Sequence, residues 1–164
     1  MKKILLVAVA ALALASCRKD PTLADRLEGT WLVNDITASG TVDLPTLGMT
    51  PIVASDKTIS PTSLFTMVQE PNRVDFAIDA ELEVVAAAFT IPFPWQQAGS
   101  GTWFAKSGGG VSPDSVLITA TDGTITRYEV LSILESAIRL RTTTAITTPA
   151  QGVLTLEFSF AKQQ

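Results

Sequence analysis

The alternation of apolar and polar residues along most of the chain constrains its fold more than any other feature. Near the C-terminus, apolar residues occupy every second position: Leu154, Leu156, Phe158 and Phe160. A longer run has the same period: Val74, Phe76, Ile78, Ala80, Leu82 and Val84. A period of two places these side chains on one face of a strand. With helical spacing, the charges between them would fall all round the cylinder. The alternation therefore predicts an all-β fold.

Turn signals separate the expected strands. The clearest is Asp122-Gly123 between two apolar runs, which is typical of a β-hairpin. The strands are expected at residues 30–36, 58–68, 73–88, 102–105, 115–120, 125–134, 136–142 and 153–161. Residues 131–138 could instead hold one helical turn. About eight strands with short connections predict an antiparallel meander, closed into a barrel because closure leaves no exposed sheet edge.

The first seventeen residues have the features of an export signal. Lys2 and Lys3 precede an apolar run over residues 4–15, which is too short to span a bilayer. The run ends in Leu14-Ala15-Ser16-Cys17, which resembles the lipobox of bacterial lipoproteins. The resemblance implies that a signal peptidase recognises Leu14, Ala15 and Ser16 and cuts before Cys17. It also implies that Cys17 carries acyl chains that attach the protein to a membrane.

This resemblance divides the chain into a signal peptide (1–16), a lipidated N-terminus and tether (17–26) and one domain (27–164). In the lipoprotein family, an aspartate directly after the cysteine signals retention in the inner membrane of some bacteria. Arg18 stands there, so the outer membrane of a two-membrane bacterium is expected. No acidic cluster follows, which favours the periplasmic face over the cell surface. Cys17 is the only cysteine, so no intramolecular disulfide can form.

Composition excludes several classes of function. The chain contains no histidine, which removes histidine-based catalytic triads and the commonest zinc ligand. Of its 12 Lys and Arg, Lys2 and Lys3 lie in the signal peptide, leaving 10 against 16 Asp and Glu, a net charge of −6. That balance argues against a nucleic-acid partner.

The candidate chemical motifs of the chain are weak. Gly108-Gly109-Gly110 lacks the lysine of a phosphate loop. Four carboxylates alternate on one expected strand face and are predicted to point to solvent: Asp75, Asp79, Glu81 and Glu83. We expect no metal, no cofactor and no enzyme activity.

A Gly-x-Trp motif, Gly29-Thr30-Trp31, opens the first expected strand. In an all-β chain of this size it resembles the lipocalins and the lipocalin-like domains of bacterial lipoproteins. The resemblance implies that Gly29 begins the first strand and that Trp31 closes one end of the barrel. It also implies that residues 37–56 form a large loop over the open mouth. A second Gly-x-Trp occurs at Gly101-Thr102-Trp103. The other lipocalin motifs have no clear match.

An eight-stranded barrel is either filled by side chains or holds one small ligand. The candidate ligand-lining residues are Phe76, Ile78, Leu82, Trp103, Ile138, Leu140, Leu154, Leu156, Phe158 and Phe160. A filled core made of the same residues is the alternative. Residues 84–95 are apolar on both faces, and Pro92 and Pro94 argue against a regular central strand there. This segment is either an exposed hydrophobic lip or a strand end and loop folded over the mouth.

Two functions are therefore expected as alternatives. The first is a lipid-anchored protein of the cell envelope that binds a small apolar ligand or lipid inside the barrel. The second is a non-enzymatic accessory protein with a filled barrel, which acts through contacts with another envelope protein.

Overall fold

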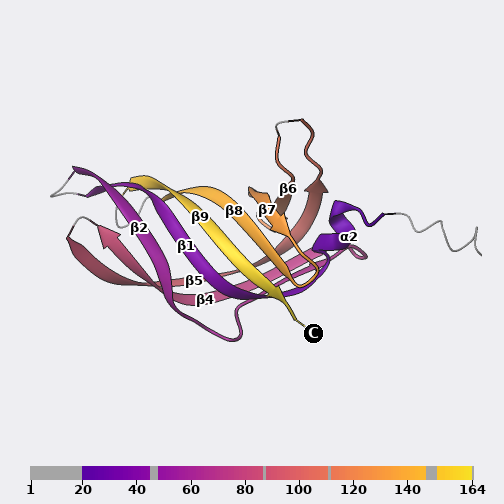
Figure 1. Cartoon of the computed structure of the whole chain (residues 1–164), viewed down its shortest axis with the longest axis horizontal. Helices are drawn as coiled ribbons and strands as arrows, with labels where there is room; N and C mark the ends of the chain where they lie inside the picture. The colour runs from indigo at the N-terminus through magenta and orange to yellow at the C-terminus, as the bar shows by residue number, and fades with distance from the viewer. Residues whose placement is uncertain (1–19, 45–47, 87, 111, 147–150, 164) are drawn as a thin grey trace, which may run out of the picture.

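The computed structural model describes residues 20–44, 48–86, 88–110, 112–146 and 151–163. They form one short helix and one antiparallel sheet (Figure 1). The elements are α2 (Leu23–Leu27), β1 (Gly29–Leu44), β2 (Gly48–Ile59), β3 (Leu64–Val68), β4 (Arg73–Ala86), β5 (Phe89–Lys106), β6 (Ser115–Ala120), β7 (Ile125–Ile133), β8 (Ala137–Ile146) and β9 (Gln151–Lys162). The all-β prediction is confirmed. No helix in these ranges is long and apolar enough to cross a bilayer.

The nine described strands make a closed ring of eight positions. From β3 to β9, each strand pairs with the next one in sequence. β9 then pairs with β1 over twelve residue positions, which closes the ring. β2 and β3 share one position, because both lie between β1 and β4 at different heights. The β1–β9 pairing joins the first and last strands of the sheet, so neither of these two strands is left as an edge there.

Residues 37–56 do not form a loop over the mouth, so that expectation was wrong. The described residues of this segment, 37–44 and 48–56, belong to β1 and β2, which pair from Thr37↔Ser55 to Leu44↔Gly48. Their sequence alternates too: Ala38, Val42, Ile52 and Ala54 are buried, while the residues between them are mostly exposed. Many of these residues are Thr and Val, which favour strands. The glycines and prolines of the segment concealed this pattern.

The strand expected at residues 58–68 is interrupted. Residues 60–63 leave the ladder between β2 and β3, and the buried Ser63 replaces the missing backbone pairing. Its hydroxyl donates to the carbonyl of Asp79 at 3.1 Å and accepts from the Asp79 amide at 3.0 Å. On its other side, the Ser63 carbonyl accepts from the Val33 amide at 3.0 Å. Ser63 thus joins β1 to β4 where the ladder is broken.

β5 is longer than the expected strand at 102–105, and it includes Pro92 and Pro94. Its first part pairs with β4, from Ala86↔Phe89 to Val74↔Gly101. Its pairing with β6 begins only at Gly101, so Phe89–Gly99 has no described strand partner on its other side. Prolines are tolerated on such an edge, because the backbone donor they lack is not needed there. The expected loop over the mouth is therefore an edge strand.

The helix α2 was not expected, because residues 17–26 were assigned to a tether. Thr22 caps it: the Asp25 amide donates to the Thr22 hydroxyl at 3.2 Å, and the Thr22 amide donates to the Asp25 carboxylate at 2.7 Å. Leu23 and Leu27, four residues apart, are both buried against the sheet. By contrast, the alternative helical turn at 131–138 is absent, since β7, a short bend and β8 occupy that segment.

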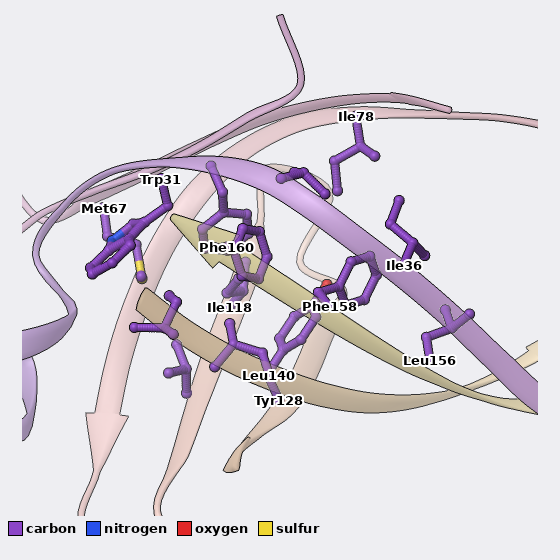
Figure 2. Close-up of a cluster of buried hydrophobic side chains, with 14 of the residues drawn as sticks. Trp31, Ile36, Met67, Ile78, Ile118, Tyr128, Leu140, Leu156, Phe158 and Phe160 are labelled. Carbon is purple, nitrogen blue, oxygen red and sulfur yellow. The ribbon is translucent and has the colours of Figure 1, made fainter. Parts of the chain in front are cut away.

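The packed core lies inside the ring, toward the end that carries α2. Figure 2 shows Trp31 and Met67 at one end of the core and Ile36 and Leu156 at the other. Phe158, Phe160 and Tyr128 lie between them. The end of β1 and the start of β2 lie at the opposite end of the molecule from α2 (Figure 1).

Candidate functional site: a cavity inside the ring

The two Gly-x-Trp motifs place their tryptophans at the α2 end of the ring. Trp31 is fully buried, and its indole N–H donates to the Leu27 carbonyl at 2.8 Å. Gly29 begins β1 with φ +140°, and a Cβ there would meet the Lys162 side chain at 3.1 Å. The Lys162 ammonium lies 5.4 Å from the centre of the Trp31 ring, a cation–π contact. Trp31 is thus a core residue at the α2 end of the ring.

Trp103 is held at the same end by backbone contacts. Its indole N–H donates to the Val68 carbonyl at 2.9 Å. The Asn72 amide side chain binds the Trp103 backbone twice, at 2.8 and 2.9 Å. Gly101 leaves no room for a side chain, because a Cβ would lie 2.1 Å from the Thr119 carbonyl oxygen. Trp103 is therefore a core residue, 4% exposed, that lines no cavity.

Above this packed end, aromatic rings form a continuous layer across the interior. Phe65 lies 5.5 Å from Phe160, and Phe160 lies 6.0 Å from Phe158, measured between ring centres. Phe158 in turn contacts Trp95 at 5.7 Å and Tyr128 at 6.3 Å. The Phe158–Phe160 pair is stacked and the others are tilted or edge-on, and aromatic pairs favour offset-stacked and edge-on arrangements. The packed core ends at this aromatic layer, which forms the floor of the space beyond it.

Beyond the floor lies a cavity of about 1090 Å³. That volume is at the upper end of the range for small-molecule sites in proteins. Its walls are mostly apolar and come from β1, β2, β4, β5, β8 and β9; they include Ala38, Val42, Ile52, Ala54, Leu82, Val84, Ala86, Ile91, Phe93, Trp95, Ile146, Leu154, Leu156 and Phe158. Many of these residues are small, so they cover the inner face of the sheet without filling the space.

Four of the predicted lining residues border this cavity: Leu82, Leu154, Leu156 and Phe158. The other six do not border it and lie in the packed core or against it: Phe76, Ile78, Trp103, Ile138, Leu140 and Phe160. Prediction from alternation cannot separate the two groups, because it identifies the inner face but not the height along the strand. The interior is thus filled at the α2 end and hollow at the other.

Sequence reasoning missed Tyr128 and the inner residues of β1 and β2. Tyr128 is buried on β7 between Arg127 and Glu129. Its alternation with charged neighbours was a usable signal for an inward position. Trp95, Ile91 and Phe93 belong to the segment for which a hydrophobic lip and a folded-over loop were both considered; they line the cavity from β5, and Ile91 and Phe93 are also exposed.

One side of the cavity is bordered by polar residues. β6 and β7 are short, and their hairpin turn lies beside Ser100 of β5, where the Thr121 amide donates to the Ser100 carbonyl at 3.3 Å. Above this turn, Thr142–Ile146 of β8 has no described strand partner on the side away from β9. The residues here include Thr124, Thr126, Arg127, Glu129, Arg141, Thr143 and Thr144. Between β5 and β8, the wall of the cavity therefore extends less far from the α2 end than it does on the other sides.

The ion pairs of the ring are at least partly exposed to solvent. Arg141 donates to Glu129 at 2.6 Å, and Arg139 donates to Glu157 at 3.1 Å. On β4, the predicted outward carboxylates are exposed or half-buried; Asp75 pairs with Arg73 and Glu81 pairs with Lys57. Among the described residues, no three cysteine, aspartate or glutamate side chains gather closely enough to hold a metal ion.

Burial is the main cause of a raised pKa at two groups, Tyr128 and Asp35. Burial raises the pKa of the Tyr128 hydroxyl, so it stays protonated at neutral pH. The pKa of Asp35 is also raised, first by burial and then by its hydrogen bond to the neighbouring Asp56 carboxyl and the repulsion between the two charges. Asp35 lies at a register shift in the pairing of β1 with β9, on the exposed surface.

Comparison with known families identifies the N-terminal segment. Residues 1–17 match the model of the prokaryotic membrane lipoprotein lipid attachment site. The chain is a bacterial lipoprotein. The residues that carry this match, including Leu14, Ala15, Ser16 and Cys17, lie outside the described residues. No curated protein and no solved structure matches the chain. The lipoprotein thus joins a lipid-anchored N-terminus to an antiparallel β-fold with an apolar cavity.

Proposed function

We propose that this lipoprotein binds a small apolar molecule or a lipid inside a lipocalin-like barrel. The observation that carries the proposal is the cavity of about 1090 Å³ between the aromatic floor and the end of the ring opposite α2. Its walls are mostly aliphatic and aromatic, so water finds few hydrogen-bond partners there. Transfer of an apolar ligand from water into this cavity is therefore favourable. The proposed activity is binding, without a catalytic step or a cofactor.

Lipid attachment places the protein at the bacterial cell envelope. We further propose that it resides at the outer membrane, on the periplasmic face, since Arg18 follows Cys17 in place of an aspartate. An apolar molecule crossing the periplasm needs shielding from water. A lipid-anchored binding protein would supply that shielding close to a membrane.

A matched pair of substitutions on β2 tests binding in the cavity. Ala54 is buried and lines the cavity, whereas the next residue, Ser55, is exposed on the outer face. The chain from residue 17 onward, with Cys17→Ala, retains every described contact, because the described fold begins at Asp20. Ala54→Phe should greatly reduce uptake of the neutral probe N-phenyl-1-naphthylamine, and Ser55→Phe should leave it unchanged. Native mass spectrometry of the same chain should detect a co-purified apolar molecule. A wild-type chain that is bare and takes up no probe would contradict the proposal.

The accessory-protein alternative has one observation in its favour. Several large apolar side chains are exposed near the end of the ring opposite α2, including Met49, Val53, Val85, Phe89 and Val153. Val53 and Val85 are neighbours in the β2–β4 pairing. Exposed apolar patches commonly mark interaction sites. This alternative predicts that Val53→Asp abolishes crosslinking to an envelope partner while Ala54→Phe does not. The cavity hypothesis predicts that Ala54→Phe, but not Val53→Asp, abolishes probe uptake.

A further inference from the structure

Two aromatic side chains that border the cavity carry a hydrogen-bonding group with no protein partner within the described residues: the buried Tyr128, with its hydroxyl, and the half-buried Trp95, with its indole N–H. In the other two tryptophans of the chain, the indole N–H donates a hydrogen bond to a backbone carbonyl. Trp31 donates to the Leu27 carbonyl and Trp103 donates to the Val68 carbonyl. Buried Tyr and Trp residues usually find such a partner. The two that lack one both line the cavity.

These two residues lie at the same depth in the ring. Both rings contact Phe158, at 5.7 Å for Trp95 and 6.3 Å for Tyr128. Figure 2 shows Tyr128 beside Phe158 in the interior of the ring. They come from β5 and β7, the strands on either side of the short β6. Two aromatic residues that carry a hydrogen-bond donor thus contact the floor of an otherwise mostly apolar cavity and line it.

The surroundings favour an uncharged polar group on the ligand. The charged residues that border the cavity are Arg127, Glu129 and Arg141. Arg127 and Glu129 flank the buried Tyr128 on its strand, so their side chains take the opposite face. Arg141 is paired with Glu129 at 2.6 Å. A carboxylate at the floor would therefore lose its hydration without gaining a buried cation, which is costly.

The donors also define what the ligand must offer. An indole N–H only donates, and a protonated tyrosine hydroxyl donates and accepts. The raised pKa of Tyr128 keeps its hydroxyl a donor well beyond neutral pH. The complementary group is an acceptor oxygen without a negative charge, such as the carbonyl of an ester, a ketone or an amide.

We propose that the cavity selects a neutral apolar molecule bearing an acceptor oxygen, which receives hydrogen bonds from the Tyr128 hydroxyl and the Trp95 indole N–H. This inference rests on the proposed function and specifies the class of its ligand. The aliphatic part of the ligand lies along the walls of β1, β2, β4 and β9.

Three probes of matched chain length test the inference: methyl decanoate, decanoate and 1-chlorodecane. Each is titrated against N-phenyl-1-naphthylamine bound to the Cys17→Ala chain at pH 7. The ester should displace the dye at a concentration about 3- to 10-fold lower than 1-chlorodecane, the effect of a net hydrogen bond. Decanoate should be the weakest of the three.

Tyr128→Phe removes one oxygen atom and keeps the ring. It should abolish most of the preference for the ester over 1-chlorodecane, because the hydrogen bond to the ester is lost. Trp95→Phe is the second variant and should reduce the same preference. Thr66→Val, which removes a hydroxyl bonded to Thr30 and absent from the cavity lining, is the control and should change neither titration.

The outcomes separate this inference from the function on which it rests. Equal displacement by the ester and 1-chlorodecane in the wild-type chain overturns the inference and leaves apolar binding in place. So does an ester preference that both Tyr128→Phe and Trp95→Phe retain. Tighter binding of decanoate than of the ester overturns it too, because that result would mean that the carboxylate binds the Arg127 guanidinium. Failure of the wild-type chain to take up the dye contradicts the proposed function itself.

Discussion

The indole N–H of Trp31 donates to the carbonyl oxygen of Leu27 at 2.8 Å, and both residues are fully buried. This contact joins the last residue of α2 to the first strand of the ring. It also satisfies one of the backbone carbonyls that a helix leaves free at its C-terminal end. The short helix is thereby fixed over the closed end, although five residues are too few for a stable isolated helix.

Trp31→Phe should lower the free energy of unfolding by about 2–3 kcal/mol. The loss combines one buried hydrogen bond, worth about 1 kcal/mol, with the space left by the smaller ring. Urea denaturation followed by circular dichroism measures it. Phe104→Ala, which truncates a largely exposed aromatic residue, should cost less than about 0.5 kcal/mol. Equal stabilities of wild type and Trp31→Phe would show that the closed end does not depend on this contact.

Thr22→Ala should destabilise the fold by about 1 kcal/mol, because it removes the side-chain cap of α2. The matched control is Thr121→Ala in the exposed β6–β7 turn, where no hydroxyl bond is described. Hydrogen exchange gives a local readout: the amides of α2 should exchange faster in Thr22→Ala, and those of β8 and β9 should not. Unchanged exchange in α2 would mean that packing of Leu23 and Leu27 alone holds the helix.

Asp35→Asn should make stability less dependent on pH in mildly acidic solution. The folded pKa of Asp35 is raised, mainly by burial and then by Asp56. Its protonated form therefore favours folding, and this contribution is fully present below the ordinary aspartate pKa of 3.8 and lost as the pH rises through the folded pKa. At neutral pH the substitution should stabilise the protein, by less than about 0.5 kcal/mol because the site is exposed. Melting curves from pH 3 to 7 measure the difference, and a loss of stability in Asp35→Asn at neutral pH would refute this account.

Cys17→Ala should abolish acylation and release the full-length protein from membranes, since the lipid attachment site is the anchor. Fractionation of cells, with metabolic labelling by a palmitate analogue, measures both effects. Arg18→Gln leaves the cysteine in place and should remain labelled and membrane-bound. Unchanged partition of Cys17→Ala would mean that the chain binds the membrane by another route.

The inner faces of the strands could be predicted from sequence, but their lengths and heights could not. The β4 and β9 runs stand out because every second residue is large and apolar, as with Leu156 and Phe158. On β1 and β2 the inward residues are small, such as Ala38 and Ala54, so the contrast that marks a strand is weak. Those small residues are also what keeps the cavity open. The cavity wall formed by β1 and β2 was therefore the hardest part of the site to predict.

The division between packed and hollow interior depends on contacts between distant strands. Phe76 and Phe158 both belong to alternating runs, yet Phe76 packs on Phe65 and Phe158 forms the floor of the cavity. Only the register of the strands sets these heights, and one sequence does not contain it. Tyr128 was missed for the same reason, because its contacts with Phe158 and Phe65 join strands far apart in the chain.

The position of α2 determines how far the cavity stands from the anchoring lipid. Three peptide units join Cys17 to Asp20, and an extended chain of that length spans at most about 11 Å. The closed end is therefore confined to the membrane surface. β1 rises from that end through 16 residues, a contour of about 50 Å before its tilt is counted. The open end of the cavity thus reaches at most several nanometres from the membrane surface. That distance depends on the length of the strands and not on a flexible linker.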